Sequence, residues 1–304
     1  MCVGSLQLEV SVGYGKAMRI SYLPENGDVS RFPNLLGEQR LFHFGACDPM
    51  LAHVTAISDF MSKEVVTAYS HSNVSNAVRL MVDHNIGSVV VVDASGPIGV
   101  FSERDLIGKV LGRQKRPQEP ILMEVMSRSF NSVRQDASLA EAAKAMSMKK
   151  GRLMVFDDGT LVGIVTATDI MRQIHRTGES FDISKVYSKK IFEVGPETSL
   201  EMVVQLMDKR RIGSVIVFER KQPSGIFTER DLLRSVVVPN FRLNARVGDL
   251  ATRPIITAQL GIDGREAIGI MVQHRIKRLP LTESDKVVGI VTARDLVEAF
   301  ASSS

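Results

Sequence analysis

Apolar residues recur at helical spacing in four segments of the chain. The pattern i, i+3, i+4, i+7 places them on one face of an amphipathic helix. It occurs at Val74, Ala77, Val78 and Met81, at Leu139, Ala142, Ala143 and Met146, and at Leu200, Val203, Val204 and Met207. The fourth segment has Ala267, Ile268 and Met271, but Gly264 stands where its first apolar residue is expected. This glycine predicts a weaker start for the fourth helix.

A short apolar run follows each predicted helix and is typical of a buried strand. The four runs span residues 88–92, 153–156, 214–218 and 279–281. Turn residues come next, as in the Asp157, Asp158, Gly159 sequence, and then a second strand and a second helix. Each unit is therefore predicted to be β-α-β-β-α, and the fold class to be α/β (α+β).

A seven-residue motif repeats at the end of each unit, and internal repeats of this kind decide the fold. The four copies are GVFSERD (99–105), GIVTATD (163–169), GIFTERD (225–231) and GIVTARD (289–295). Their aspartates are 64, 62 and 64 residues apart. One copy would be a weak signal, whereas four in register are a specific one.

The motif and its β-α-β-β-α context resemble the cystathionine-β-synthase (CBS) domain family over roughly residues 55–301. The resemblance implies that consecutive motifs pair, here into two pseudo-twofold modules. In its number of motifs the chain resembles the gamma subunit of AMP-activated protein kinase. We expect one module at 55–178, with motifs at about 55–115 and 121–177. The other is expected at 179–304, with motifs at about 183–238 and 246–301. A single unit has too little core to be stable alone, which also favours pairing.

Residues 1–54 form an N-terminal extension of unknown role. Alternating apolar residues at 6–12 and 18–22 predict a hairpin that turns at 13–15, and residues 23–54 give no clear signal. Residues 178–180 are a candidate hinge between the modules, and 112–120 and 239–246 are predicted to be exposed linkers.

The motif residues suit a ligand site at the end of a strand. Glycine permits a close approach of backbone, and the Ser or Thr begins the next helix, whose free amides favour anions. The resemblance implies that the aspartates bind ribose hydroxyls and that the hydroxyl residues bind phosphate. The aspartates are Asp105, Asp169, Asp231 and Asp295, and the hydroxyl residues are Ser102, Thr166, Thr228 and Thr292. The same spacing could instead be a helix-capping box, and the two roles can coexist.

The resemblance also implies that each aspartate faces an adenine pocket from the partner motif. Asp105 is expected beside Phe130, Asn131 and Ser132, and Asp169 beside Val65, Val66, Thr67, Ile86 and Gly87. Asp231 is expected beside Ile255, Ile256 and Thr257, and Asp295 beside Ile191, Phe192, Glu193, Ile212 and Gly213.

Cations distinguish two of these sites. Arg152 borders the expected Asp105 site, and Lys277 and Arg278 border the Asp231 site, where they would form charge-assisted hydrogen bonds to phosphate. The alternative is that they are solvated surface residues. The arginines at 104, 230 and 294 directly precede aspartates, so helical geometry turns them away from ribose, toward the neighbouring module or the phosphates.

Composition narrows the class of protein. The chain has 304 residues, of which 44% are hydrophobic and 24% charged, and no apolar run is long enough to span a membrane. Its two cysteines, Cys2 and Cys47, form no disulfide framework or zinc pattern, and the histidines lack metal spacing. We therefore expect a cytoplasmic protein without a bound metal.

No catalytic motif is present, so we expect a regulatory sensor and no enzyme. The expected ligand is AMP, ADP or ATP, with S-adenosylmethionine, NAD or a cyclic dinucleotide as alternatives, and no cofactor is required. The expected partners are an effector protein and a second copy bound through the modules. The charge of +4 and pI of about 9.1, with basic clusters at 113–116 and 209–211, leave nucleic acid as an alternative partner. A scaffold with vestigial clefts is a third alternative.

Overall fold

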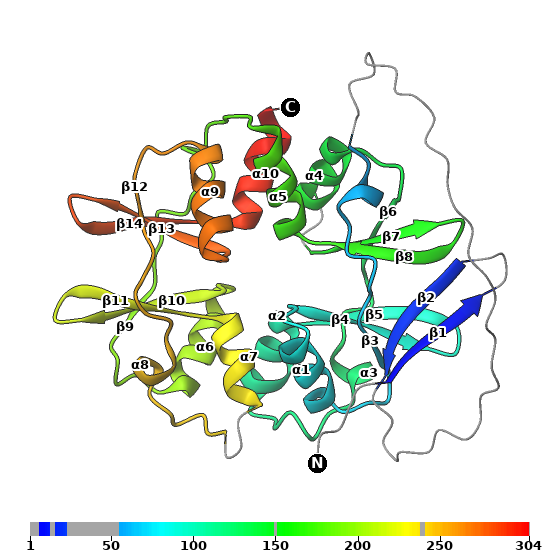
Figure 1. The fold of residues 1–304 in the computed structure, drawn as a ribbon. Helices are drawn as coiled ribbons and strands as arrows, with labels where there is room; N and C mark the ends of the chain where they lie inside the picture. Colours follow the sequence, from blue (N-terminus) through cyan, green and yellow to red (C-terminus); the bar gives the residue numbers. More distant parts are fainter. Residues whose placement is uncertain (1–5, 13–15, 23–54, 149–150, 238–240, 304) are drawn as a thin grey trace.

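Each repeated unit forms a three-stranded sheet with flanking helices, and the four units surround a common centre (Figure 1). The computed structural model describes residues 6–12, 16–22, 55–148, 151–237 and 241–303. The first unit contains η1 (Ile57–Asp59), β3 (Thr67–Tyr69), α1 (Val74–Asp83), β4 (Ser88–Asp93), β5 (Gly96–Ser102) and α2 (Glu103–Asp105). The second contains α3 (Leu122–Val125), β6 (Asn131–Arg134), α4 (Leu139–Met148), β7 (Leu153–Asp157), β8 (Thr160–Val165) and α5 (Ala167–Thr177).

The second half repeats this order. The third unit contains β9 (Glu193–Val194), α6 (Leu200–Arg210), β10 (Ser214–Glu219), β11 (Gln222–Thr228) and α7 (Glu229–Val236). The fourth contains α8 (Val247–Leu250), β12 (Ala258–Gln259), α9 (Gly264–His274), β13 (Arg278–Glu283), β14 (Lys286–Thr292) and α10 (Ala293–Ser303). The predicted fold class and the repeated β-α-β-β-α order are confirmed.

The four sheets share one topology and one irregularity. In each sheet the first strand is parallel to the middle strand, which is antiparallel to the last. The register of β4 and β5 shifts between Val91 and Val92, next to the pair of Val91 with the motif glycine Gly99. Equivalent shifts occur in the other three sheets. A bulge at this place bends the strand just before the motif.

The motif glycines lie where a segment of the neighbouring unit crosses the strand. Ser127 exchanges backbone hydrogen bonds of 2.8 and 2.9 Å with Val100. A Cβ on Gly99 would be 2.8 Å from the Ser127 carbonyl oxygen. Equivalent bridges join Ser62 to Ile164, Ser188 to Ile290 and Ile226 to Thr252. The first unit is therefore interleaved with the second, and the third with the fourth. We call these pairs the first and second modules.

The helices bury their apolar faces between the modules. One hydrophobic cluster joins α1 of the first unit to α6 and α7 of the third, and another joins α4 and α5 of the second unit to α9 and α10 of the fourth. All fifteen apolar residues that the helical pattern predicts to be on the inner face are buried. A smaller cluster joins the first two sheets through Val90, Met154 and Leu161. Units one and two thus each share buried clusters with two other units.

The helix after the first motif differs from the prediction. Only α2 is α-helical there. A π-helical turn, η2 (Leu106–Val110), and a 3-10 turn, η3 (Leu111–Arg113), follow it. Gly108 and Gly112 lower the helix propensity of this segment. They also let it approach α6, since a Cβ on Gly108 would be 2.9 Å from Oδ1 of Asp208.

The predicted N-terminal hairpin is present as β1 (Leu6–Val12) paired antiparallel with β2 (Lys16–Tyr22). Its turn, the segment 23–54 and both cysteines are outside the described residues. The described parts of the two predicted linkers are largely exposed, although Pro117 and Pro120 are buried. None of the described helices has the length and apolar character needed to cross a lipid bilayer.

The last residue of the candidate hinge (178–180) and the residue after it both contact the fourth unit. Ser180 donates a 2.6 Å hydrogen bond from Oγ to Oδ2 of Asp263. The buried ring of Phe181 packs edge-on against Phe300, with centroids 5.9 Å apart. Gly264 begins α9 directly beneath this ring, where a Cβ would be only 2.2 Å from a ring carbon. The residue expected to weaken the helix start is therefore required by packing, and Asp263 caps the helix by accepting from the Glu266 amide at 2.8 Å.

We predict that Gly264→Ala lowers the free energy of unfolding by about 1–3 kcal/mol, because the added methyl group overpacks the Phe181 contact. Gly269→Ala, in the same helix, is the matched control. Its Cβ would meet only the His175 ring at 3.5 Å, so alanine should be neutral or stabilising there. Chemical denaturation of both variants measures the difference, and equal effects would contradict this packing role.

Candidate functional site

The motif aspartates all cap helices with one carboxylate oxygen. In the first unit, Oδ2 of Asp105 accepts from the Ser102 amide at 2.9 Å and from its hydroxyl at 2.6 Å. The threonine at the motif position makes the same two bonds in the other units, all between 2.6 and 2.9 Å. The capping alternative is thus correct for Oδ2. Any ligand contact must use Oδ1.

Two of the aspartates also use Oδ1 within the protein. Oδ1 of Asp105 accepts from the Ser127 hydroxyl at 2.8 Å and pairs with the Lys109 ammonium at 2.7 Å. Lys109 follows Asp105 by four residues, a spacing that places two side chains next to each other on a helix. Oδ1 of Asp231 accepts from the Thr252 hydroxyl at 3.0 Å. Ribose would have to displace a protein donor from Asp105, whereas Oδ1 of Asp231 accepts only one hydrogen bond from the described residues.

The other two aspartates are more available. Oδ1 of Asp169 has a distant cation, the Arg172 guanidinium at 3.9 Å, and Oδ1 of Asp295 has no partner among the described residues. Burial raises the pKa of Asp295, and the hydrogen bonds from Thr292 only partly offset this. The sequence argument favoured the Asp105 and Asp231 sites because cations border them. The carboxylate geometry favours Asp169 and Asp295.

In each module, a segment just before each expected adenine triplet crosses the last strand of the other unit. The bridge of Ser62 with Ile164 leads residues 65–67 along the second unit, whose motif carries Asp169. The corresponding crossings lead residues 130–132 toward the Asp105 motif, residues 255–257 toward the Asp231 motif and residues 191–193 toward the Asp295 motif. Each triplet runs into the first strand of its own unit. Phe130 is exposed, whereas Val65 is buried.

The loop glycines paired with these triplets lie under cations. A Cβ on Gly87 would be 2.8 Å from Nη2 of Arg152, and one on Gly213 would collide with the guanidinium of Arg278. Arg152 donates to the Gly87 carbonyl oxygen at 2.5 Å. The second module has the same arrangement, except that Arg278 donates to the Glu229 carboxylate. The alternative in which these two arginines are solvated surface cations is therefore wrong.

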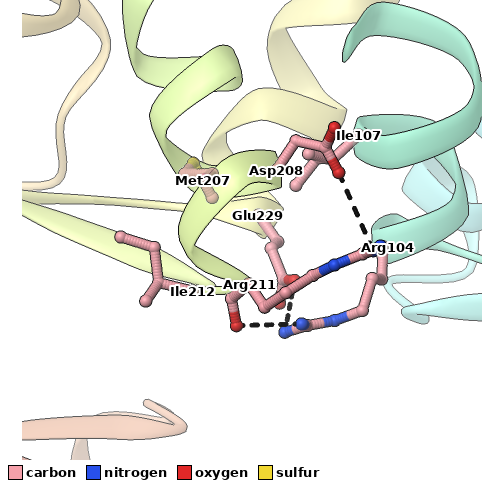
Figure 2. A pocket seen from close by; sticks show the side chains of 7 residues that line it. All are labelled: Arg104, Ile107, Met207, Asp208, Arg211, Ile212 and Glu229. Atoms are coloured by element: carbon pink, nitrogen blue, oxygen red, sulfur yellow. Dashed lines mark hydrogen bonds and ion pairs between the residues drawn. The ribbon is translucent and has the colours of Figure 1, made fainter. Parts of the chain in front are cut away.

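A cluster of charges from all four units occupies the centre of the ring. Arg104 of the first unit donates to the backbone oxygen of Arg211 at 3.0 Å and to Glu229 of the third unit at 3.3 Å (Figure 2). Arg230 of the third unit pairs with Glu103 of the first at 2.9 Å. The arginines that precede the motif aspartates in units one and three thus reach the neighbouring module, as one of the sequence alternatives had it. Only a small cavity, about 10 Å³, lies beside Arg104 and Glu229.

This cluster, which we call the central cluster, contains more cations than glutamates. Its six cations are Arg104, Arg152, Arg230, Lys277, Arg278 and Arg294, and its two glutamates are Glu103 and Glu229. Nε of Arg294 is buried without a hydrogen-bond partner among the described residues. Lys277 makes no ion pair with the described residues, and although its side chain is exposed overall, desolvation lowers the pKa of its ammonium group.

Sequence reasoning missed three features of this site. It did not single out Glu103 and Glu229, although alanine replaces them in the second and fourth motifs. It did not identify Lys109, although the i, i+4 spacing from Asp105 was visible in the sequence. An open groove of about 470 Å³, lined by Glu193, Phe218 and Lys221 at the outer end of β9, was also not expected. Among the described residues, no group of His, Cys, Asp or Glu could hold a metal ion.

A model of the CBS domain matches the chain four times, at residues 57–112, 122–176, 183–238 and 247–302. The chain belongs to the CBS domain family. The matches cover well over half of the chain, and each includes one copy of the seven-residue motif. The chain is thus a CBS-domain protein with four CBS motifs.

A solved structure with a similar fold covers most of this chain. The crystal structure of MJ1225 from Methanocaldococcus jannaschii, proposed to be an archaeal homologue of g-AMPK, covers 81% of this chain and 100% of that chain at 19% identity, with a TM-score of 0.72. This likeness shows the fold alone. The uncharacterized protein MJ1404 of the same organism is 24% identical over 266 residues, 81% of this chain and 62% of that protein. This chain therefore spans less than two thirds of that relative.

A shorter match falls on an enzyme. Inosine-5'-monophosphate dehydrogenase of Thermoplasma acidophilum is 34% identical over 110 residues, which are 36% of this chain and 21% of the enzyme. The proteins that are similar to this chain therefore include an enzyme, of which the match covers only a small part.

We predict that Asp295→Asn changes how stability depends on pH. Burial raises the pKa of Asp295, so folding favours the protonated acid. The stability contribution of this proton is present below the ordinary pKa and is lost as the pH rises through the raised value. Asparagine does not titrate and keeps an oxygen that can accept from Thr292. The free energy of unfolding of the variant relative to wild type should therefore increase from about pH 4 to about pH 7. Chemical denaturation at both pH values measures this, and a constant difference would contradict it.

Proposed function

We propose that this CBS-domain protein is a non-catalytic sensor that binds adenine nucleotides, with the phosphates at the central cluster. The observation that carries the proposal is the gathering of six cations from all four units at the meeting point of the motifs. Guanidinium groups bind phosphate through paired hydrogen bonds, and Arg294 has an unused buried donor for such a bond. A phosphate group would meet several cationic donors together there.

Nucleosides would enter first at the motifs of units two and four. Asp169 and Asp295 have an oxygen available for ribose hydroxyls, and Thr166 and Thr292 begin α5 and α10 beside them. The adenine would pack on residues 65–67 and 86–87 at one site and on residues 191–193 and 212–213 at the other. The site of Asp105 would fill only where a ligand displaces Lys109 and Ser127, and at Asp231 a ligand would share Oδ1 with Thr252.

The ligand is proposed to be AMP, ADP or ATP. The cations of the central cluster support this choice, because guanidinium and ammonium groups bind phosphate through charge-assisted hydrogen bonds. S-adenosylmethionine, NAD and cyclic dinucleotides share adenosine and are alternatives. Since the central cluster draws on both modules, a ligand that binds there would favour one arrangement of the modules, and an effector protein or a second copy of the chain would read that arrangement.

Nucleic acid is the second candidate ligand. One observation favours it: exposed basic residues at 113–116 and 209–211 are brought together where η3 packs against α6. Binding of this kind weakens steeply with salt. It would use the outer surface of the ring, whereas the proposed nucleotide sites use its interior.

The proposed function is tested by the thermal stability of the protein with AMP, ADP, ATP and adenosine. At 100 times its dissociation constant a ligand should add about 2.7 kcal/mol to the free energy of unfolding. We expect the phosphorylated ligands to stabilise the protein more than adenosine does, and Lys277→Gln to reduce this advantage because it removes an unpaired cation. No shift with any adenosyl ligand, together with salt-sensitive binding of single-stranded DNA, would favour the nucleic-acid alternative.

Aspartate variants test which motifs bind ribose. We expect Asp169→Asn and Asp295→Asn each to weaken nucleotide binding by roughly 5- to 150-fold, the equivalent of losing about 1–3 kcal/mol of hydrogen bonding. Asp105→Asn is the matched control, since its carboxylate is already saturated by Lys109 and Ser127, and should change affinity by less than about threefold. Calorimetry gives both affinity and stoichiometry. A larger loss from Asp105→Asn would reverse the proposed order of sites.

A further inference from the structure

Two glutamates of the central cluster form crossed ion pairs between the modules. Arg104 of unit one pairs with Glu229 of unit three at 3.3 Å, and Arg230 of unit three pairs with Glu103 of unit one at 2.9 Å. Arg230 also donates to the Asn85 side chain at 2.7 Å. The two glutamates occupy the same motif position, directly before the arginine, and alanine fills that position in units two and four. At this motif position an anion therefore occurs only in units one and three, one of the two pairs of units whose helices pack across the modules.

Glu229 also pairs with Arg278, a cation that the proposed function assigns to phosphate binding. Its Oε2 accepts from Arg278 at 2.5 Å while its Oε1 accepts from Arg104. Both partners of the Arg278 pair are largely buried, with 17% of the arginine side chain and 10% of the glutamate side chain exposed. Burial alone would raise the pKa of Glu229, but the attraction of Arg278, Arg104 and Arg152 lowers it, so the group is ionised at neutral pH.

A carboxylate and a phosphate group compete for the same donors. Both accept paired hydrogen bonds from one edge of a guanidinium group, and an edge that binds one cannot bind the other. Glu229 already occupies donors of both Arg278 and Arg104, so a phosphate group that used these donors would have to take its place. Removing Glu229 without a replacement would leave buried cations unpaired, which is strongly unfavourable. Exchange of one anion for another avoids that cost.

We propose that Glu103 and Glu229 are internal competitors of the ligand phosphates, and that phosphate binding replaces Glu229 on Arg278 and Arg104. The exchange breaks the Arg104–Glu229 pair, so occupancy of the centre loosens the contact between units one and three. The two glutamates would then set both the affinity for phosphate and its coupling to module arrangement. This inference rests on the proposed function.

Glutamine variants test the competition, because glutamine keeps the size of the side chain and removes its charge. Calorimetric titration with ATP and with inorganic pyrophosphate should give at least about fivefold tighter binding to Glu229→Gln than to wild type, and a smaller gain for Glu103→Gln. Adenosine binding should be unchanged. Glu219→Gln, in the same unit but outside the central cluster, is the matched control and should bind like wild type.

Hydrogen exchange provides the second measurement. In wild type, ATP should reduce protection of the backbone amides of residues 103–110 and 229–236, which face each other across the modules. In Glu229→Gln without ligand, protection there should already be reduced. Binding that is equal or weaker in both glutamine variants, with wild type still binding ATP, would overturn the competition and leave the proposed function intact. Failure of wild type and both variants to bind ATP or pyrophosphate would overturn the proposed function itself. If Glu229→Gln does not fold, Glu103→Gln decides the outcome.

Discussion

The arrangement of the whole ring follows from one constraint: each unit has two apolar surfaces, and it can bury neither by itself. Its sheet needs the other unit of the module, as the contact of Val90 with Met154 shows, and its helices need a unit of the other module. A unit that packs on two neighbours in this way closes a ring of four. Closure brings the ends of all four motif strands to one place, and the charges at those ends become a single cluster.

Such a concentration of cations is unfavourable unless anions accompany them. The protein supplies two of these anions from its own repeat, in one of the two pairs of units whose helices meet across the modules. Because the glutamates occur in units one and three only, the fourfold repeat becomes a twofold arrangement, with different chemistry at alternate motifs. The same alternation appears at the motif aspartates, which accept hydrogen bonds on Oδ1 in units one and three and are more available in units two and four.

The likeness to MJ1225, at 19% identity, is a likeness of fold, which depends on the pattern of apolar residues along the chain. Apolar periodicity and the motif glycines specify which faces are buried and where backbones cross. Ligand choice depends on individual side chains at the centre, such as Lys277 and Arg294. A shared fold therefore carries less information about the ligand than the central cluster does.

The sequence by itself determined the repeat, its β-α-β-β-α order and the buried helix faces, because these depend on periodic patterns that local geometry imposes. It also predicted why each motif has a glycine. Only the tertiary structure decided which helices pack together, since Val78 and Met81 would be equally well buried by any apolar partner. It also decided that Gly264 makes room for Phe181, and that Arg104 and Arg230 pair with glutamates of the other module. These contacts join residues far apart in the chain, and their distances follow from how the closed ring packs.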